Sequence, residues 1–401
     1  MKHYRTLALL LCSLVSLALS AKSYELNSPD GHLRTTISDD DRIEWSITHD
    51  GVPVLAPSAI SLQTATGTWG TKTRILKAHR RSISETLPTV AYKRAIVNHQ
   101  CNELELICQG EFNLVVRAYN DGCAYRLISK SRKPLTVVNE SNEFAFLGDY
   151  KAFIPYVNDN RAGERYCFSF ESYYDEQSLM SIYPDSLAIT PLAVCLPNGM
   201  KAVVMETAVE NYPGMFLYRH AGSPANTLRS AFAPLPLESE VGGFNRLNLM
   251  PTKRADYIAV LESQQPLPWR LVLVTTADTQ LLDTDTPYCL APQCRLNDVS
   301  WIKPGKVAWD WWNNWNIYGV DFRAGINTPT YKYYIDFAGR QKLEYIIVDE
   351  GWSSEENLLE YANDELSIPE LVEYGKQRGN GKLRPFVPGT GDYHRRSADS
   401  F

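Results

Sequence analysis

The sequence predicts a multidomain protein of class β plus α/β, in which a large antiparallel β-sandwich precedes a parallel α/β sheet. Three observations lead to this prediction. Residues 24–276 alternate apolar and polar side chains in short runs separated by Gly, Asn, Asp and Pro, as antiparallel strands with one buried face do. A stretch with turn-forming residues follows at 283–304. Beyond it, strand-like and helix-like segments alternate, which is typical of βαβ units.

The sandwich strands are predicted from their period-two alternation. Helical periodicity is almost absent from this part, so we assign residues 22–282 to one all-β domain, within the size that such sandwiches reach. The clearest strand-like runs are His32–Ser38, Arg42–His49, Glu103–Cys108, Asn113–Tyr119, Ala124–Ile128, Lys201–Thr207 and Arg270–Thr275.

After the linker at 283–304, residues 305–379 contain two strand–helix pairs. Each helix has a proline in its first turn, Pro329 and Pro369, where the missing N–H costs nothing. Thr328 is expected to cap the first helix. The predicted order is strand Val307–Trp312, helix Thr328–Gln341, strand Leu343–Val348 and helix Ile368–Gln377.

These units are expected to be the first of a (β/α)8 barrel that is incomplete in this sequence. Such a barrel needs roughly 250 residues, and its active site lies at the carboxyl ends of the strands. Residues 380–401 contain Pro, Gly and a His-Arg-Arg cluster but no apolar strand run. We therefore expect an aberrant tail at 380–401 in place of a third unit.

The first 21 residues are typical of a secretory signal peptide. Lys2 and Arg5 precede the apolar run Leu7–Leu19, which is too short for a comfortable membrane span and ends near the small residues Ser20 and Ala21. The mature chain is therefore expected in the periplasm or outside the cell, without membrane insertion. The net charge is −6, so the chain lacks the excess of Lys and Arg that is typical of nucleic-acid-binding proteins, and nucleic acid is not expected as a partner.

The cysteines after residue 21 are scattered and form no CxxC pair, so neither a zinc site nor a dense disulfide framework is indicated. Cys289 and Cys294 are close enough in sequence to form a bridge across a turn in an oxidising compartment.

The segment Trp301–Trp315 (WIKPGKVAWDWWNNW) predicts a carbohydrate site. It holds five of the nine tryptophans. Flat indoles such as Trp309 and Trp311 can stack on a sugar, while Asp310 and the asparagines hydrogen-bond its hydroxyls. The alternative is that these tryptophans are simply buried core.

A second segment, Tyr345–Trp352 (YIIVDEGW), is an apolar strand that ends in two carboxylates. Successive strand residues point to opposite faces, so Asp349 and Glu350 cannot have the same role. Glu350 is the best candidate for a catalytic group, and Asp349 and Trp352 are candidate sugar contacts. The alternative is a solvated pair that caps the strand.

Glycoside hydrolysis needs two carboxyl groups across the scissile bond, about 5 Å apart when configuration is retained. Asp310 and Glu350 could line one pocket from adjacent strands. For Asp310, however, we expect hydrogen bonding to sugar hydroxyls rather than catalysis. No GxSxG, HExxH or P-loop motif offers different chemistry. Glu206, before a Tyr-Pro-Gly turn, could reach a hard cation such as calcium, or could be an ordinary surface glutamate.

Taken together, five motifs resemble glycoside hydrolase family 97. The resemblance implies an N-terminal β-supersandwich, a catalytic (β/α)8 barrel and a small C-terminal β-domain. By the same resemblance, Glu206 is a calcium ligand, Glu350 an active-site glutamate and Asp310 a substrate contact. The motifs are Val115–Leu127, Met205–Phe216, Leu267–Val274, Leu296–Trp312 and Tyr345–Trp352.

The segment WDWWNNW resembles the retaining, α-galactosidase-like branch of the family more closely than the inverting, α-glucosidase branch. The implied function is hydrolysis of terminal α-glycosidic bonds, α-galactosides favoured, in oligosaccharides or polysaccharides, by a monomer or weak dimer. In the retaining branch the nucleophile and the acid/base follow on later strands that have no counterparts in these 401 residues, so this chain is expected to be inactive. The alternatives are an inverting α-glucosidase of the same family and a non-catalytic secreted carbohydrate-binding protein.

Overall fold

The computed structural model describes residues 22–157, 165–166, 170, 172–242, 248–311, 314–349, 351–353, 360 and 363–378. The predicted signal peptide, the predicted aberrant tail and Glu350 lie outside these described residues. The chain divides into two compact units. The first comprises Met1–Thr89 and Arg94–Arg295, and the second comprises Val90–Lys93 and Leu296–Phe401.

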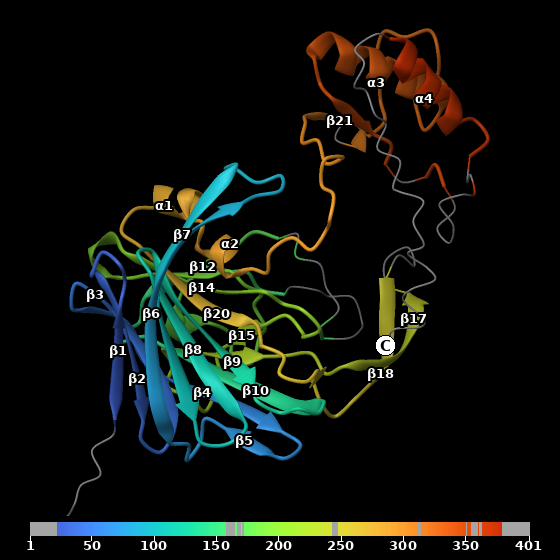
Figure 1. The fold of residues 1–401 in the computed structure, drawn as a ribbon. Coiled ribbons are helices and arrows are strands. Elements are labelled where there is room, and N and C mark those ends of the chain that lie inside the picture. Colours follow the sequence, from blue (N-terminus) through green and yellow to red (C-terminus); the bar gives the residue numbers. More distant parts are fainter. Residues whose placement is uncertain are drawn as a thin grey trace, which may run out of the picture. The chain divides into compact units, whose positions relative to one another are not determined.

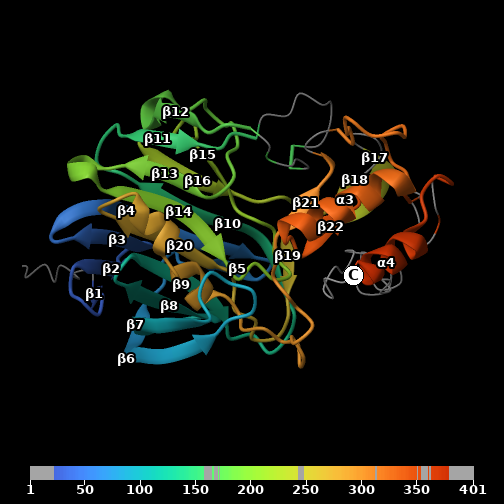
Figure 2. The ribbon, with the colours of Figure 1, turned by 90° about the horizontal axis from the view of Figure 1, so that it is seen from above.

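The first unit is built from two nine-stranded sheets whose strand pairs are antiparallel (Figure 1, Figure 2). The order of the first sheet is β1 (Ser23–Asn27), β2 (Leu33–Asp39), β3 (Ile43–His49), β4 (Val52–Thr64), β10 (Leu135–Ala145), β16 (Thr227–Ala231) and β15 (Phe216–Tyr218), with β5 (Gly67–Trp69) on β4 and β19 (Ala259–Leu261) on β10.

The order of the second sheet is β12 (Asp175–Ser178), β11 (Lys151–Ile154), β13 (Leu192–Cys195), β14 (Lys201–Thr207), β20 (Trp269–Thr275), β9 (Gly122–Ser129), β8 (Phe112–Tyr119), β7 (Ile96–Cys108) and β6 (Ile75–Pro88). A separate hairpin joins β17 (Pro236–Gly242) to β18 (Asn248–Arg254).

Aromatic pairs join the inner faces of the two sheets. Trp45 of the first sheet meets Tyr125 of the second edge-on, with ring centroids 4.8 Å apart. Trp69 stacks on Phe112 with centroids 5.0 Å apart. All four side chains are buried, so the predicted β-sandwich is confirmed.

A buried ion pair also crosses the sandwich. The Arg270 guanidinium on β20 donates to both carboxyl oxygens of Glu140 on β10, at 2.8 Å from Nε and 2.7 Å from Nη2. The Tyr212 hydroxyl and the Asn142 amide donate to the same carboxylate at 2.7 and 2.8 Å. The charge is thereby fully hydrogen-bonded, the condition under which a buried carboxylate is tolerated.

The second unit contains β21 (Val307–Trp309), α3 (Thr328–Gln341), β22 (Tyr345–Ile347) and α4 (Ile368–Gln377). The two strands pair in parallel, with Ala308 opposite Ile346. Both of these residues belong to one buried cluster with Tyr331 and Ile335 of α3, and with Leu371 of α4. The predicted βαβ organisation is therefore present, although both strands are shorter than predicted. The barrel, complete or incomplete, stays a prediction.

The structure corrects two details of the sequence analysis. The cap of α3 is Asn327 rather than Thr328, because the Asn327 side chain accepts from the Thr330 N–H at 3.0 Å. The bridge between Cys289 and Cys294 is not formed, and both thiols are free.

The residues before the second unit also contain two short helices, α1 (Thr279–Asp283) and α2 (Thr286–Leu290), where the end of the β-domain and the start of a linker were predicted. No helix among the described residues is long and apolar enough to cross a membrane.

Candidate functional site

The alternation of β21 and the residues after it divides the tryptophan-rich segment between two faces. Ala308 and Asp310 are buried, at 7 and 0% exposure. Trp309 and Trp311 point the other way and stay 37 and 47% exposed. One face of the segment therefore belongs to the core and the other is open to a ligand, because successive strand residues point to opposite sides.

The exposed face brings together three of the predicted sugar contacts. The Trp309 indole N–H donates to Oδ2 of Asp349 at 2.7 Å. The rings of Trp309 and Trp311 stack with centroids 5.5 Å apart at an interplanar angle of 24°. Parallel pairing of β21 and β22 explains the meeting, since the carboxyl ends of both strands reach the same edge. Two indole surfaces beside an oriented carboxylate suit a pyranose ring.

Asp310 lies on the opposite, helix-facing side, next to Tyr331 of α3. Burial raises the pKa of the Asp310 carboxyl, the Tyr331 hydroxyl opposes that rise, and the Asp349 charge adds to it. Within the part of the chain that the structure describes, neither carboxyl oxygen of Asp310 has a hydrogen-bond partner of ordinary geometry. Its predicted contact with substrate stays untested.

The turn after β22 is shaped by Gly351. Its φ is +89°, and a Cβ atom there would lie 2.6 Å from Cδ1 of Ile326, so only glycine fits without strain. Trp352, the next residue, is 8% exposed and packs in the core of the second unit. Its role as a sugar contact stays a prediction, as does the catalytic role of Glu350, which lies outside the described residues.

Glu206, the predicted calcium ligand, lies opposite Arg270 across β14 and β20. Its Oε1 accepts from the Met215 N–H at 2.6 Å, and Arg270 donates to its Oε2. Burial raises the pKa of Glu206, and the guanidinium opposes that rise.

Calcium takes six to eight oxygen ligands. Among the described residues there is no group of three or more His, Cys, Asp and Glu side chains arranged for a metal ion. The described neighbours of Glu206 therefore do not form a calcium site by themselves, and calcium stays a prediction.

Comparison with protein families decides the relationship. The family model described as "Glycosyl-hydrolase 97 N-terminal" matches residues 26–292, and the one described as "Glycoside hydrolase 97" matches residues 311–384. The chain belongs to glycoside hydrolase family 97. The resemblance found in the sequence motifs is thereby confirmed.

Two curated relatives match over most of this chain. A protein named "Retaining alpha-galactosidase" from Bacteroides thetaiotaomicron is 40% identical over 380 residues, which cover 93% of this chain and 57% of that protein. A "Probable retaining alpha-galactosidase" from Streptomyces bingchenggensis is 25% identical over 351 residues, covering 84% of this chain and 47% of that protein. This family 97 chain thus spans about half the length of the curated relatives that it matches.

Solved structures support the fold. A family 97 enzyme from Pseudoalteromonas sp. strain K8, solved in complex with acarbose, aligns with a TM-score of 0.73 at 21% identity, covering 90% of this chain and 53% of that chain. A β-arabinopyranosidase aligns with a TM-score of 0.72 at 19% identity, covering 90% of this chain and 55% of that chain.

Two residues that shape these sites were not singled out from the sequence of this family 97 member. Arg270 is the only charged residue in the apolar strand Trp269–Thr275, which is a signal that it requires a buried partner. Tyr331 carried no such signal, because its position beside Asp310 depends on how α3 packs against β21.

Proposed function

We propose that this family 97 chain carries the β-supersandwich and the first barrel strands of a retaining glycosidase that hydrolyses terminal α-galactosidic bonds in oligosaccharides or polysaccharides. The supporting observation is the 40% identity, over 93% of this chain, to the protein named as a retaining α-galactosidase. The sequence WDWWNNW at residues 309–315 also resembles the retaining, α-galactosidase-like branch of the family.

In this proposal the exposed face of β21 and β22 holds the terminal sugar. Trp309 and Trp311 stack on its C–H face, and Asp349, oriented by the Trp309 N–H, accepts from its hydroxyls. Asp310 and Trp352 are buried, which favours a structural role for both over direct contact. Glu350 remains the proposed catalytic carboxyl.

A retaining mechanism requires two carboxyl groups about 5 Å apart on either side of the scissile bond. Asp349 and Glu350 are adjacent along the chain and cannot be that pair, because neighbouring strand residues point to opposite faces. Asp310 is buried against Tyr331. We therefore propose that the 401 residues alone bind a terminal sugar without hydrolysing it.

The test is isothermal titration calorimetry of the 401-residue chain with melibiose and with maltose, alongside hydrolysis of the 4-nitrophenyl α-galactoside and α-glucoside. We expect melibiose to bind more tightly, the Trp309→Ala variant to lose that binding, and neither glycoside to be hydrolysed. A preference for maltose would favour the α-glucosidase branch. Turnover of either glycoside would overturn the proposed loss of activity, and absence of sugar binding would remove the site.

We further propose, on the family resemblance alone, that calcium binds at Glu206 with oxygen ligands beyond those described. No step of the reaction is derived through the metal. Calcium titration by calorimetry, with magnesium as control and Glu206→Gln as the variant, tests this. Absence of calcium binding to the 401-residue chain would show that the described carboxylate is not sufficient.

We also propose that the chain is exported to the periplasm or the medium through residues 1–21, and that the mature protein is a monomer or a weak dimer. Cell fractionation with N-terminal sequencing tests the first statement, and light scattering after gel filtration tests the second. Retention of residues 1–21 in a cytoplasmic fraction, or a stable higher oligomer, would contradict them.

A further inference from the structure

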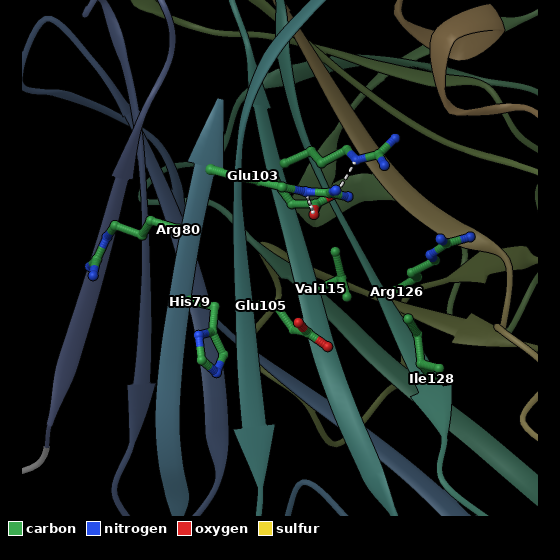
Figure 3. Close-up of a pocket in the computed structure, with 9 residues that line it drawn as sticks. His79, Arg80, Glu103, Glu105, Val115, Arg126 and Ile128 are labelled. Atoms are coloured by element: carbon green, nitrogen blue, oxygen red, sulfur yellow. Dashed lines mark hydrogen bonds and ion pairs between the residues drawn. The ribbon is translucent and has the colours of Figure 1, made fainter. Parts of the chain in front are cut away.

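A basic cavity lies on the outer face of the second sheet, and none of the candidate sugar-site residues line it. It has a volume of about 310 Å³ and is lined by side chains of β6, β7, β8 and β9 (Figure 3). We call it the arginine cavity. The lining residues that matter for its chemistry are His79, Arg81, Glu103, Glu105, Arg117 and Arg126.

Strand register explains why these charges meet. Arg81 lies opposite Glu103, which in turn lies opposite Arg117 across β6, β7 and β8. In the next row along the same face, Val115 on β8 separates Glu105 from Arg126. Cross-strand neighbours on one face are close enough to interact, so the register alone assembles the cavity.

One of the cations, Arg126, has no hydrogen-bonded counter-ion among the described residues. Glu103 accepts from Arg81 Nε at 2.6 Å and from Arg117 Nε at 2.7 Å, so that carboxylate already serves two guanidiniums. Figure 3 shows both of these contacts at Glu103, and none that reaches Arg126. Among the described residues, no hydrogen bond or ion pair reaches the Arg126 guanidinium, and its Nε atom is buried without a partner.

Packing fixes Arg126 in this position. Its guanidinium lies 4.4 Å from the centroid of the Trp269 ring, and that of Arg117 lies 4.9 Å from the same centroid. Burial and the neighbouring Arg117 charge lower the pKa of Arg126 to about 10, so the group is still charged at neutral pH. A half-buried cation without a hydrogen-bond acceptor is costly, and an anionic ligand would relieve that cost.

A second depression adjoins the arginine cavity. It has a volume of about 520 Å³ and shares Arg80 and Arg81 with the first. The rest of its lining includes the neutral polar side chains of Asn27, Ser82 and Asn102. Amides and hydroxyls are the groups that hydrogen-bond sugar hydroxyls. Glu25 also lines this depression, which therefore carries charges of both signs. Asn102 and Arg80 hydrogen-bond to β1 of the first sheet, so the depression lies around the edge strand β6 from the arginine cavity.

We propose that the arginine cavity binds the oxyanion of an anionic oligosaccharide, either a uronate carboxylate or a sulfate ester, through Arg126. Guanidinium groups pair bidentately with such planar or tetrahedral oxyanions. This site is separate from the candidate hydrolytic site, so its failure would leave the proposed function untouched.

The test is calorimetric titration of the 401-residue chain with three probes of similar length, namely oligogalacturonate, a sulfated galacto-oligosaccharide and the neutral galacto-oligosaccharide. We expect one of the two anionic probes to bind and the neutral probe to bind at least about tenfold more weakly through this site. The two anionic probes distinguish a carboxylate from a sulfate. Inorganic sulfate reports whether the oxyanion alone is sufficient.

Variants connect the binding to named residues. Arg126→Gln is expected to weaken anionic binding about tenfold. Arg295→Gln is the matched control, because this exposed arginine pairs with Glu210 outside both depressions. Glu105→Gln removes a negative charge from the lining and is expected to strengthen the same binding. A variant that merely disturbed folding would not strengthen it.

Three outcomes would overturn the proposal: equal affinity for the neutral and anionic probes, anionic binding that survives Arg126→Gln, or tighter binding of polyglutamate than of either acidic sugar. If Arg126→Gln fails to fold, two other variants test the proposal. Glu105→Gln should strengthen the binding of the anionic probe and Arg81→Gln should weaken it. Arg81 is 66% exposed, so its replacement should weaken binding without affecting the core.

Discussion

At the scale of single residues, Glu140 and Arg270 form an ion pair that is buried inside the sandwich. Glu140→Gln keeps the shape of the side chain but leaves the Arg270 charge buried with only Glu206 as an anionic partner. We expect the free energy of unfolding to fall by about 3 kcal/mol or more, as when one member of a buried pair is removed. Urea denaturation followed by tryptophan fluorescence measures it.

The matched control for that variant is Glu176→Gln, which breaks the exposed pair between Lys151 and Glu176. Exposed pairs contribute little because water and salt screen them. Equal stability losses in the two variants would contradict the role assigned to the buried pair.

His99 is the second residue whose chemistry gives a prediction. Its ring contacts Glu85 through Nδ1 at 2.9 Å and the Tyr119 hydroxyl through Nε2 at 3.0 Å. Burial lowers the pKa of His99 below its ordinary value of about 6.5. The folded state therefore favours the neutral ring. The stability that this contributes is present above the ordinary pKa and is lost as pH falls through it towards the lower folded value.

We accordingly expect the midpoint of urea denaturation to decrease between roughly pH 7 and pH 5, and His99→Gln to reduce that decrease. His32→Gln is the opposite control. Hydrogen bonding to Asp50 raises the pKa of His32, so its contribution is present at low pH and its loss should make the decrease steeper. A pH dependence unchanged by His99→Gln would show that the ring titrates normally.

At the scale of elements, the alternation of β21 separates binding from stability. Trp309→Ala removes an exposed indole and should abolish sugar binding with little effect on unfolding. Asp310→Asn should change the stability and leave sugar binding unchanged. Because burial raises the pKa of Asp310, its ionised form costs stability at neutral pH, and that cost is relieved below its folded pKa. The variant should therefore unfold at a higher temperature and bind sugar as before.

Calorimetric sugar titration and thermal unfolding of both variants check this separation. Loss of sugar binding in Asp310→Asn, with Tyr331→Phe as the companion variant on the same face, would show that the buried side of the strand acts on the ligand. Equal loss of stability in Trp309→Ala would show that the indole pair is structural.

Elements with a local signal were predictable from the sequence. The helices 328–341 and 368–377 agree with the structure at both ends, because a first-turn proline and apolar periodicity mark them. The cap of α3 was misplaced by one residue, since Asn327 and Thr328 are both able to cap and only backbone geometry decides. The helices α1 and α2 were missed because each has only five residues, too few to show helical periodicity, and the Asp, Thr and Pro residues at 283–287 are typical of turns.

The candidate sites were predictable from local sequence patterns only in part. The sequence predicted Trp309, Trp311 and Asp349 as sugar contacts, and the structure brings these three together. It placed Asp310 with them, although alternation points this residue towards α3. The arginine cavity was not predicted, because its charges come from four strands and meet only through a register that no local pattern encodes.

At the scale of the whole molecule, the two units have separate cores. Every member of the large cluster lies between Leu26 and Val274, and every member of the small one lies between Ala308 and Leu371. The sandwich thus has its own complete hydrophobic interior, which is what allows a domain to fold alone. We expect a chain of residues 22–295 to fold and to unfold cooperatively in urea, with the aromatic pair Trp45–Tyr125 giving the near-ultraviolet dichroism of a packed core.

This fragment also separates the two binding sites proposed for the protein. It contains Arg126 and the arginine cavity but not Trp309, Trp311 or Asp349. We expect it to bind the anionic oligosaccharide as the 401-residue chain does and to lose the binding of melibiose, both measured by calorimetry. A fragment that binds a hydrophobic dye and lacks a cooperative transition would contradict an independent sandwich core, and retained melibiose binding would move the sugar site from the second unit to the first.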